Sequence, residues 1–408
     1  MTLSDEEARW RLALLDTVFR PSAPVDREDL FSGRGSQLAS VQEAIGAVGQ
    51  HAVIFGERGV GKTSLAATSA DITRRRESIA MRVNCDQSDN FFTLWQKVID
   101  EFQVVLADKP SPALEAALER ATEVLDNDSL GPNHVRVAFR HVTPLSPVVI
   151  VFDEFDQMND QATLSLISNT IKLLSDHIES VTLVAVGVAS NVSDLIAGHQ
   201  SIQRNLVQVR MPRMVPDELE GILDRGLGQL AMTATAQTRS FLRTVPRGLP
   251  QYAHLLAQEG ARQALWNGEA EITFAHVFDG LQVGLEKLDY TLASAFDEAT
   301  YSAKPSRFAE VLYACAMVRP DRDGYFSPSA IRQHYSSIIG QQVAIDRYNP
   351  HLTALSQARG EILHRRGPER ARRYRFANTL MEPYIMLKGL AEGKITPDSL
   401  ADPSPSDS

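Results

Sequence analysis

The stretch Gly56-Glu57-Arg58-Gly59-Val60-Gly61-Lys62-Thr63 decides how this sequence folds. It matches the pattern G-x-x-x-x-G-K-[ST] at every fixed position. Glycines let the backbone turn tightly, so that successive N–H groups converge on an anion. The apolar run HAVIF from His51 precedes the stretch, and the helical run SLAATSADITRRR from Ser64 follows it. A strand before and a helix after are the context in which this pattern forms a phosphate-binding loop.

The loop predicts a nucleoside triphosphate, ATP, as ligand. Its main-chain N–H groups and the positive end of the following helix would surround the phosphates. Lys62 would neutralise the β- and γ-phosphates, and Thr63 would bind Mg²⁺. The candidate nucleotide-binding residues here are Gly56, Glu57, Arg58, Gly59, Val60, Gly61, Lys62, Thr63 and Ser64.

A second motif, VVIVFDE from Val148 to Glu154, is an apolar strand that ends in two carboxylates. Asp153 is predicted to hold Mg²⁺, either directly or through water. Glu154 is predicted to polarise the water that attacks the γ-phosphate. The motif therefore predicts hydrolysis in addition to binding, with Glu154 and Lys62 as catalytic residues.

Short apolar runs alternate with longer helical patterns between residues 31 and 214. Short continuous apolar runs are typical of strands covered on both faces of a parallel sheet. A helix from Gln161 is predicted by the spacing of Leu164, Ile167, Ile171, Leu174 and Ile178. We therefore predict a doubly wound α/β core, with strands at HAVIF (His51), SIAMRVN (Ser78), VVIVFD (Val148), TLVAVGV (Thr182) and LVQVRM (Leu206).

The regions outside this core have a different composition. Residues 1–30 read as an amphipathic opening followed by an extended, Pro-containing lead-in to the core. Strand patterns disappear after Pro216, and helical runs from Pro216, Pro250 and Phe274 predict an all-helical lid domain over residues 215–300. The tail, residues 394–408, is rich in Pro, Ser and Asp and is predicted to be disordered.

Residues 301–393 are predicted to form a winged helix. Three helical segments precede two short strands, ILHRRG and RRYRFA, which would enclose a wing. Seven arginines lie between residues 356 and 375 in a chain of net charge −10. Such arginines would either contact DNA phosphates or pair with acidic surface of the protein itself. The candidate DNA-binding residues are Arg365, Arg366, Arg370, Arg372 and Arg373.

Several of these motifs together resemble AAA+ ATPases close to the origin-recognition ATPases and the STAND signalling ATPases. The resemblance covers roughly residues 29–393. It is carried by the phosphate loop, by Phe31-Ser32-Gly33-Arg34, by Thr182 to Asn191, and by Arg247-Gly248-Leu249-Pro250. It implies that Phe31 and Arg34 contact adenine. It also implies that the helix led by Pro250 packs near the nucleotide.

The same resemblance implies further catalytic residues. Asn191, with Ser190 as the neighbouring alternative, would orient the attacking water at the end of its strand. Asn84 would sense the γ-phosphate, couple to Glu154, or simply end its strand. Arg204 would act as an arginine finger on a neighbouring subunit's ATP, with Arg210 and Arg213 as rivals.

One element of these families is missing. Gln251 and Tyr252 stand where origin-recognition relatives have a nucleotide-sensing arginine. Arg247 could supply a substitute charge, and without one the resemblance implies slow turnover.

Composition sets the outer limits on function. The chain has 408 residues, 43% hydrophobic, with no apolar run of membrane-spanning length and no secretory signal. Cys85 and Cys315 are the only cysteines, which favours a cytoplasmic protein without disulfides. We therefore expect a Mg²⁺-dependent ATP-hydrolysing switch whose nucleotide state controls self-association and the binding of DNA or a protein partner. The alternative is a nucleotide-gated binding module with little or no hydrolysis.

Overall fold

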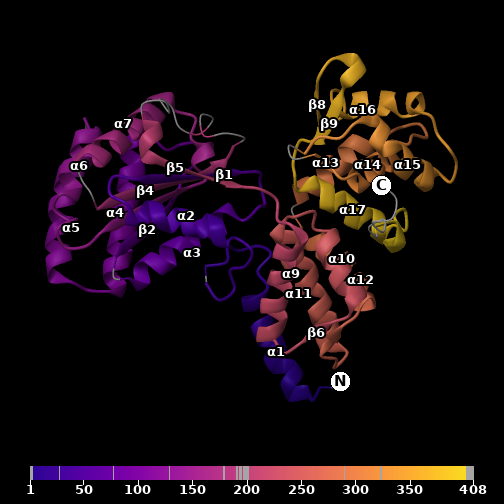
Figure 1. Ribbon diagram of the computed structural model, residues 1–408, viewed down its shortest axis with the longest axis horizontal. Helices are drawn as coiled ribbons and strands as arrows, with labels where there is room; N and C mark the ends of the chain where they lie inside the picture. The colour runs from indigo at the N-terminus through magenta and orange to yellow at the C-terminus, as the bar shows by residue number, and fades with distance from the viewer. Residues whose placement is uncertain are drawn as a thin grey trace. The chain divides into compact units, whose positions relative to one another are not determined.

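The chain, in a computed structural model, forms two compact units. The core unit is Ala23–Arg213, and the helical unit combines Met1–Ser22 with Met214–Ser408 (Figure 1). The structure describes residues 3–26, 28–76, 78–127, 129–177, 180–189, 192, 195, 202–288, 290–321 and 324–400.

The core unit is built on a parallel sheet of five strands in the order β2-β3-β4-β1-β5. The strands are β1 (His51–Gly56), β2 (Ile79–Asn84), β3 (Val148–Asp153), β4 (Val181–Val188) and β5 (Leu206–Met211). Every residue of β1 and β3 is buried, because helices cover both faces of such a sheet. The predicted parallel α/β core is confirmed.

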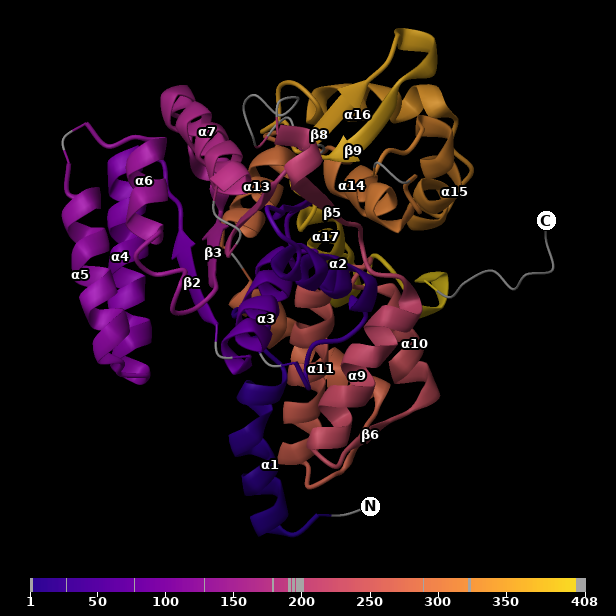
Figure 2. The ribbon, with the colours of Figure 1, turned by 60° about the vertical axis from the view of Figure 1, so that its left-hand side comes forward.

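Helices α2 (Gly35–Gly46), α3 (Lys62–Arg75) and α7 (Gln161–His177) belong to this unit. In α7 the predicted stripe Leu164, Ile167, Ile171 and Leu174 is buried, whereas Ile178 lies outside the described residues. Three more helices, α4 (Phe91–Asp108), α5 (Pro112–Leu125) and α6 (Pro132–Phe139), separate β2 from β3 and pack side by side (Figure 2). The fully buried Trp95 of α4 meets Phe139 and Phe152 edge to face, both with ring centroids 5.8 Å away.

The helical unit begins with α1 (Asp5–Val18), which packs along α11 (Pro250–Trp266). Residues 1–30, interpreted from sequence as a lead-in to the core, thus contribute a helix to the other unit. The remaining helices of this part are α9 (Pro216–Gln229), α10 (Ala236–Thr244), α12 (Phe274–Lys287) and α13 (Tyr290–Thr300). A two-residue parallel pair, β6 (Thr233–Ala234) with β7 (Glu271–Ile272), interrupts the region predicted as all-helical.

The C-terminal part contains α14 (Phe308–Met317), α15 (Pro328–Ile339) and α16 (Asn349–Leu355). An antiparallel hairpin of β8 (Leu363–Arg366) and β9 (Arg373–Phe376) follows. Helix α17 (Met381–Ala391) comes after the hairpin. Three helices before a hairpin is the order that the sequence predicts for a winged helix.

The start of the predicted disordered tail is ordered. Ile395 is buried, and Pro397–Leu400 forms a 3-10 turn, whereas residues 401–408 lie outside the described part. Within the described residues no helix is both long and apolar enough to cross a bilayer.

Candidate functional site

The phosphate loop connects β1 to α3 and depends on its glycines. Gly59 (φ 83°) and Gly61 (φ 94°) adopt backbone conformations that side chains rarely tolerate. Gly56 (φ 153°) allows a close approach, since a Cβ there would lie 2.4 Å from the carbonyl oxygen of Met211. Gly61 caps α3, so the free N–H groups at the start of that helix face the loop.

Lys62 is held inside this loop. Its Nζ donates to the carbonyl oxygens of Gly56 (3.2 Å) and Glu57 (2.7 Å), and the side chain is 8% exposed. Burial lowers the pKa of Lys62 from 10.5 to about 8, partly opposed by the carboxylates of Asp156 and Asp153. A buried ammonium is costly unless an anion compensates it, and a triphosphate tail supplies that anion.

Thr63 and Asp153 meet at the carboxyl end of β3. Thr63 Oγ1 donates to Asp153 Oδ1 at 3.3 Å, and the Glu154 N–H donates to the same oxygen at 3.0 Å. Burial raises the pKa of the Asp153 carboxyl, which is 2% exposed. Mg²⁺ typically takes one or two protein oxygens and completes its shell with phosphate and water. The hydroxyl and carboxylate fit that demand, although the described residues contain no cluster of three or more metal-ligating side chains.

Glu154 directly follows Asp153 and is exposed. Its backbone lies in the left-handed region (φ 54°, ψ 34°). A non-glycine residue there costs on the order of 1–3 kcal/mol and persists only where the surroundings impose it. The strained backbone of Glu154 therefore indicates that its surroundings impose the conformation of this turn.

Asp156, two residues further on, was not singled out from the sequence. Its Oδ1 accepts the Val188 N–H at 2.7 Å, at the end of β4. Among neighbouring charges it has the largest effect on the pKa of Lys62. The Asp-Glu-Phe-Asp sequence and the strand that ends at Val188 were both visible in the sequence, but the contact between Asp156 and that strand was not.

Arg34 and Phe31, predicted adenine contacts, both lie in the core unit. Arg34 is 1% exposed, and its Nη2 donates to the carbonyl oxygens of Val60 and Pro212. Arg34 therefore braces the phosphate loop against the end of β5. Phe31 is half-buried, and adenine contact by either residue remains a prediction.

Glu57 of the loop forms an ion pair of 2.8 Å with Arg213. Arg213, a rival candidate for the arginine finger, is therefore engaged within its own chain. Arg204 is 77% exposed and lies 3.8 Å from Asp176. An arginine finger must be exposed to reach a neighbouring subunit, and Arg204 meets that condition. Its role stays a prediction.

Three other predicted residues stay without a structural link to the phosphate loop. Asn191 and Ser190 lie outside the described residues. Pro250 begins α11 in the helical unit, where it is buried, and its contact with nucleotide stays a prediction.

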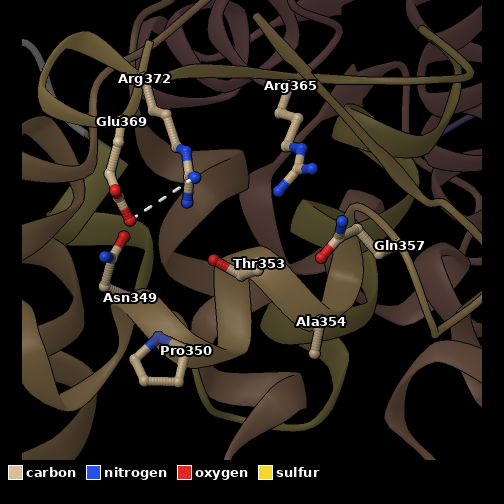
Figure 3. Close-up of a pocket in the computed structure, with 8 residues that line it drawn as sticks. All are labelled: Asn349, Pro350, Thr353, Ala354, Gln357, Arg365, Glu369 and Arg372. Atoms are coloured by element: carbon tan, nitrogen blue, oxygen red, sulfur yellow. Dashed lines mark ion pairs between the residues drawn. The ribbon is translucent and has the colours of Figure 1, made fainter.

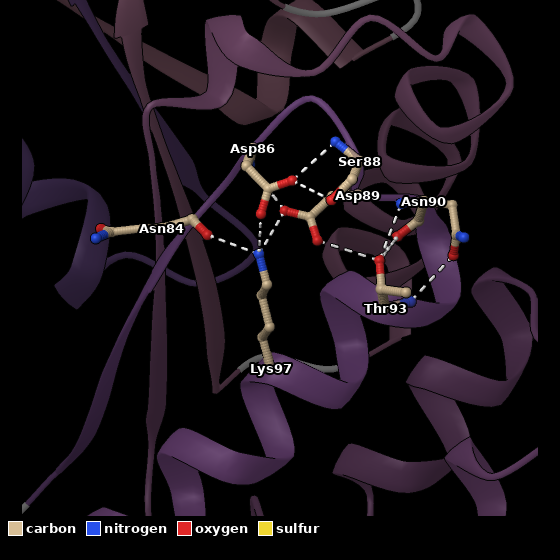
Figure 4. A network of polar contacts seen from close by, with 7 residues as sticks. All are labelled: Asn84, Asp86, Ser88, Asp89, Asn90, Thr93 and Lys97. Atoms are coloured by element: carbon tan, nitrogen blue, oxygen red, sulfur yellow. Dashed lines mark hydrogen bonds and ion pairs between the residues drawn. The ribbon is translucent and has the colours of Figure 1, made fainter.

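Asn84 ends β2 opposite Asp153 in the sheet register. A polar network behind it fixes this strand end (Figure 4). Lys97 Nζ donates to the Asn84 carbonyl oxygen (3.2 Å), to Asp86 (2.8 Å) and to Asp89 (2.7 Å). These contacts hold the backbone of Asn84, whereas its side chain is exposed.

Arg247 is engaged inside the helical unit. It donates to the carbonyl oxygens of Ala316 (3.0 Å) and Met317 (2.9 Å) and lies 3.4 Å from Glu382. Both side chains of this ion pair are at most 10% exposed. The guanidinium thus joins α14 and α17 to the preceding helices, which explains its burial without a nucleotide.

The C-terminal hairpin presents its arginines unevenly. Arg365, Arg366 and Arg370 are exposed, whereas Arg373 forms a 2.8 Å ion pair with Asp321. Arg372 lies 3.7 Å from Glu369. A groove of about 650 Å³ separates α16 from the hairpin, with Arg365 and Arg372 facing Thr353 and Gln357 across it (Figure 3).

Comparison with known proteins agrees with this geometry. Residues 30–184 match the AAA ATPase domain, and no curated protein matches the chain. A Walker-type ATPase of Pyrococcus abyssi has a similar structure, with 16% identity and a TM-score of 0.51, covering 90% of this chain and 99% of that one.

Two further similar structures score lower. Cdc6p from Pyrobaculum aerophilum has 15% identity and a TM-score of 0.47, covering 93% of this chain and 99% of its own. The Aeropyrum pernix Orc1 protein, solved with DNA, has 15% identity and a TM-score of 0.46, covering 94% and 96%. At 16% identity the likeness to the Pyrococcus abyssi structure concerns the fold alone. With both the phosphate loop and the Asp153–Glu154 pair inside the matched segment, residues 30–184 are an AAA+ P-loop ATPase domain.

Proposed function

We propose that this protein binds ATP with Mg²⁺ and hydrolyses its β–γ phosphoanhydride bond. The observation that carries the proposal is the buried Lys62 ammonium. In the contacts described for it, this ammonium donates hydrogen bonds only to backbone carbonyl oxygens of the loop. An amine placed this way is prepared to exchange carbonyl oxygens for phosphate oxygens. Thr63 and Asp153 would hold the magnesium, which when bound would offset negative charge on the phosphates.

Glu154 is the proposed general base. Its side chain is exposed, and its backbone N–H donates to the Asp153 carboxylate, so Glu154 can take a proton from a water molecule while Asp153 remains bound to its own partners. Lys62 and the loop N–H groups would stabilise charge that develops on the transferred phosphoryl group. Arg204 would add a positive charge in trans if subunits associate.

The test combines binding and turnover. Calorimetry with ATP and Mg²⁺ is expected to show binding by the wild type and by Glu154→Gln. Phosphate release is expected from the wild type and to fall at least about tenfold in Glu154→Gln. Glu119→Gln, an exposed α5 residue, is the matched control and should retain wild-type turnover. Equal turnover in wild type and Glu154→Gln would remove the hydrolytic proposal.

A nucleotide-gated module with little hydrolysis is the second candidate. The engagement of Arg247 by Ala316, Met317 and Glu382 favours it, because that residue was the substitute for the missing nucleotide-sensing arginine. Binding of ATP without measurable phosphate release, with or without duplex DNA, would support this candidate over the first.

We also propose that the C-terminal hairpin contacts the phosphates of double-stranded DNA. The exposure of Arg365, Arg366 and Arg370 supports this. Each phosphate contact should add about 0.9 to the slope of log affinity against log salt. Replacing all three by Ala should lower affinity and flatten that slope. Replacing the exposed Arg9, Arg74 and Arg140 removes the same charge elsewhere, and if both triple variants behaved alike the hairpin would not be the DNA surface.

A further inference from the structure

We propose that Asp156 is a positioning residue for ATP hydrolysis, which fixes the end of β4 against the turn that carries Glu154. This inference rests on the proposed hydrolytic function. It concerns a residue that touches neither nucleotide nor water in the scheme above and acts through its neighbours.

The contact between Asp156 and β4 is direct and tight. Asp156 Oδ1 accepts the Val188 N–H at 2.7 Å. A Cβ at Gly187 would lie 2.7 Å from Leu195 Cδ2, 2.8 Å from that same Asp156 oxygen and 3.1 Å from the Asp156 nitrogen. Separations this short require displacement, so only glycine at residue 187 lets the Asp156 turn approach the strand this closely.

The turn that contains Asp156 is also held by packing in the hydrophobic core. Phe155, between Glu154 and Asp156, is 1% exposed and packs on Phe152 with ring centroids 6.3 Å apart. Phe155 and the Val188 hydrogen bond together hold both sides of the short 3-10 turn Phe155–Gln157. These restraints explain how Glu154 keeps its strained left-handed backbone, which needs support from its surroundings.

Val188, the partner of Asp156 in this contact, lies beside the start of the phosphate loop. Val188 is paired with Gly56 in the parallel register of β4 and β1. Asp156 therefore links the turn of the proposed general base, through one backbone N–H, to the strand position that flanks the first glycine of the loop. A base that is displaced by about 1 Å can lose on the order of 100-fold in rate.

Three variants separate the hydrogen bond from the charge. Asp156→Ala removes the acceptor and is expected to lower kcat by about 10- to 100-fold while KM and the ATP Kd change by less than about threefold. Asp156→Asn keeps an Oδ1 acceptor and should retain kcat within about threefold. Gly187→Ala disturbs the contact from the other side and should resemble Asp156→Ala. Gly46→Ala is its control, because a Cβ there meets nothing within 4 Å.

Hydrogen exchange of the β4 peptide that contains Val188 provides a readout that does not depend on hydrolysis. Exchange should accelerate in Asp156→Ala and remain slow in Asp156→Asn. Wild-type kcat in Asp156→Ala, equal losses in Asp156→Ala and Asp156→Asn, or a loss confined to KM would each overturn the inference. Slow exchange in Asp156→Ala would also overturn it, because the positioning role depends on the hydrogen bond to Val188. An inactive wild type would instead refute the proposed function.

Discussion

Replacing Lys62 with Met should stabilise the nucleotide-free core unit while abolishing its affinity for ATP. If the Lys62 side chain stabilised the folded state, its replacement would instead lower the free energy of unfolding. Lys62 is buried in the loop and hydrogen-bonded to two carbonyl oxygens. Burial of the ammonium therefore lowers the stability of the folded state, and we attribute its position to ligand binding.

The magnitude follows from the pKa of Lys62, which burial lowers from 10.5 to about 8. Each pH unit corresponds to about 1.4 kcal/mol, so the charged form costs the folded state on the order of 3 kcal/mol. The two lost hydrogen bonds together offset about 1–3 kcal/mol of this. Lys62→Met should therefore raise the unfolding free energy at pH 7 by up to about 2 kcal/mol.

The pH dependence has a defined sign. Between pH 8 and 10.5 the unfolded chain retains a proton that folded Lys62 has released. The wild type should therefore gain about 1.4 kcal/mol of stability per pH unit relative to Lys62→Met across that window. Below pH 8 the difference between the two proteins should be constant.

Urea unfolding followed by Trp95 fluorescence measures this effect in the core unit. Trp95 is fully buried there, whereas Trp10 and Trp266 are exposed in the helical unit and can be replaced by Phe. Lys97→Met is the matched control: it should destabilise, because the 2%-exposed Asp89 would lose its partner. A Lys62→Met protein that is less stable at pH 7, or a difference that ignores pH between 8 and 10.5, would refute the reasoning.

Three further outcomes are expected. Asp153→Asn should remove the advantage that Mg²⁺ gives over EDTA in ATP affinity measured by calorimetry, because it neutralises the carboxylate that Thr63 contacts. Arg34→Met should lower the unfolding free energy of the core by about 1–3 kcal/mol, since Val60 and Pro212 lose a charged donor; unchanged urea midpoints would contradict this. Burial lowers the pKa of His51 to about 4, so the core should lose about 2 kcal/mol between pH 6.5 and 5, and His51→Gln should lose less.

Local sequence pattern was sufficient for the core. Strands β3 and β5 begin and end at the residues that the apolar runs predict. The phosphate loop needed no partner to be identified, because glycine spacing fixes its backbone. The polar residues after the strands were also predictable, since carboxyl ends of parallel strands share one edge.

Long-range partners of charged side chains were beyond the sequence. Adenine contact by Arg34 stays a prediction, but the sequence did not show that its guanidinium donates to the carbonyl oxygens of Val60 and Pro212. Arg247 was predicted as a possible substitute charge, and the sequence did not show that it donates to the carbonyl oxygens of Ala316 and Met317. Similarly, the opening helix α1 could have been assigned to either unit until its packing on α11 was known.

The sequence by itself determined the chemistry that the phosphate loop and the Asp153–Glu154 pair can perform, because those residues lie close along the chain and their spacing sets the backbone. Only the tertiary structure decided which side chains support them. Asp156 meets Val188 across 32 residues, and Arg213 meets Glu57 across 156. Such contacts depend on which strand ends become neighbours in the sheet, and that order is a property of the packed core.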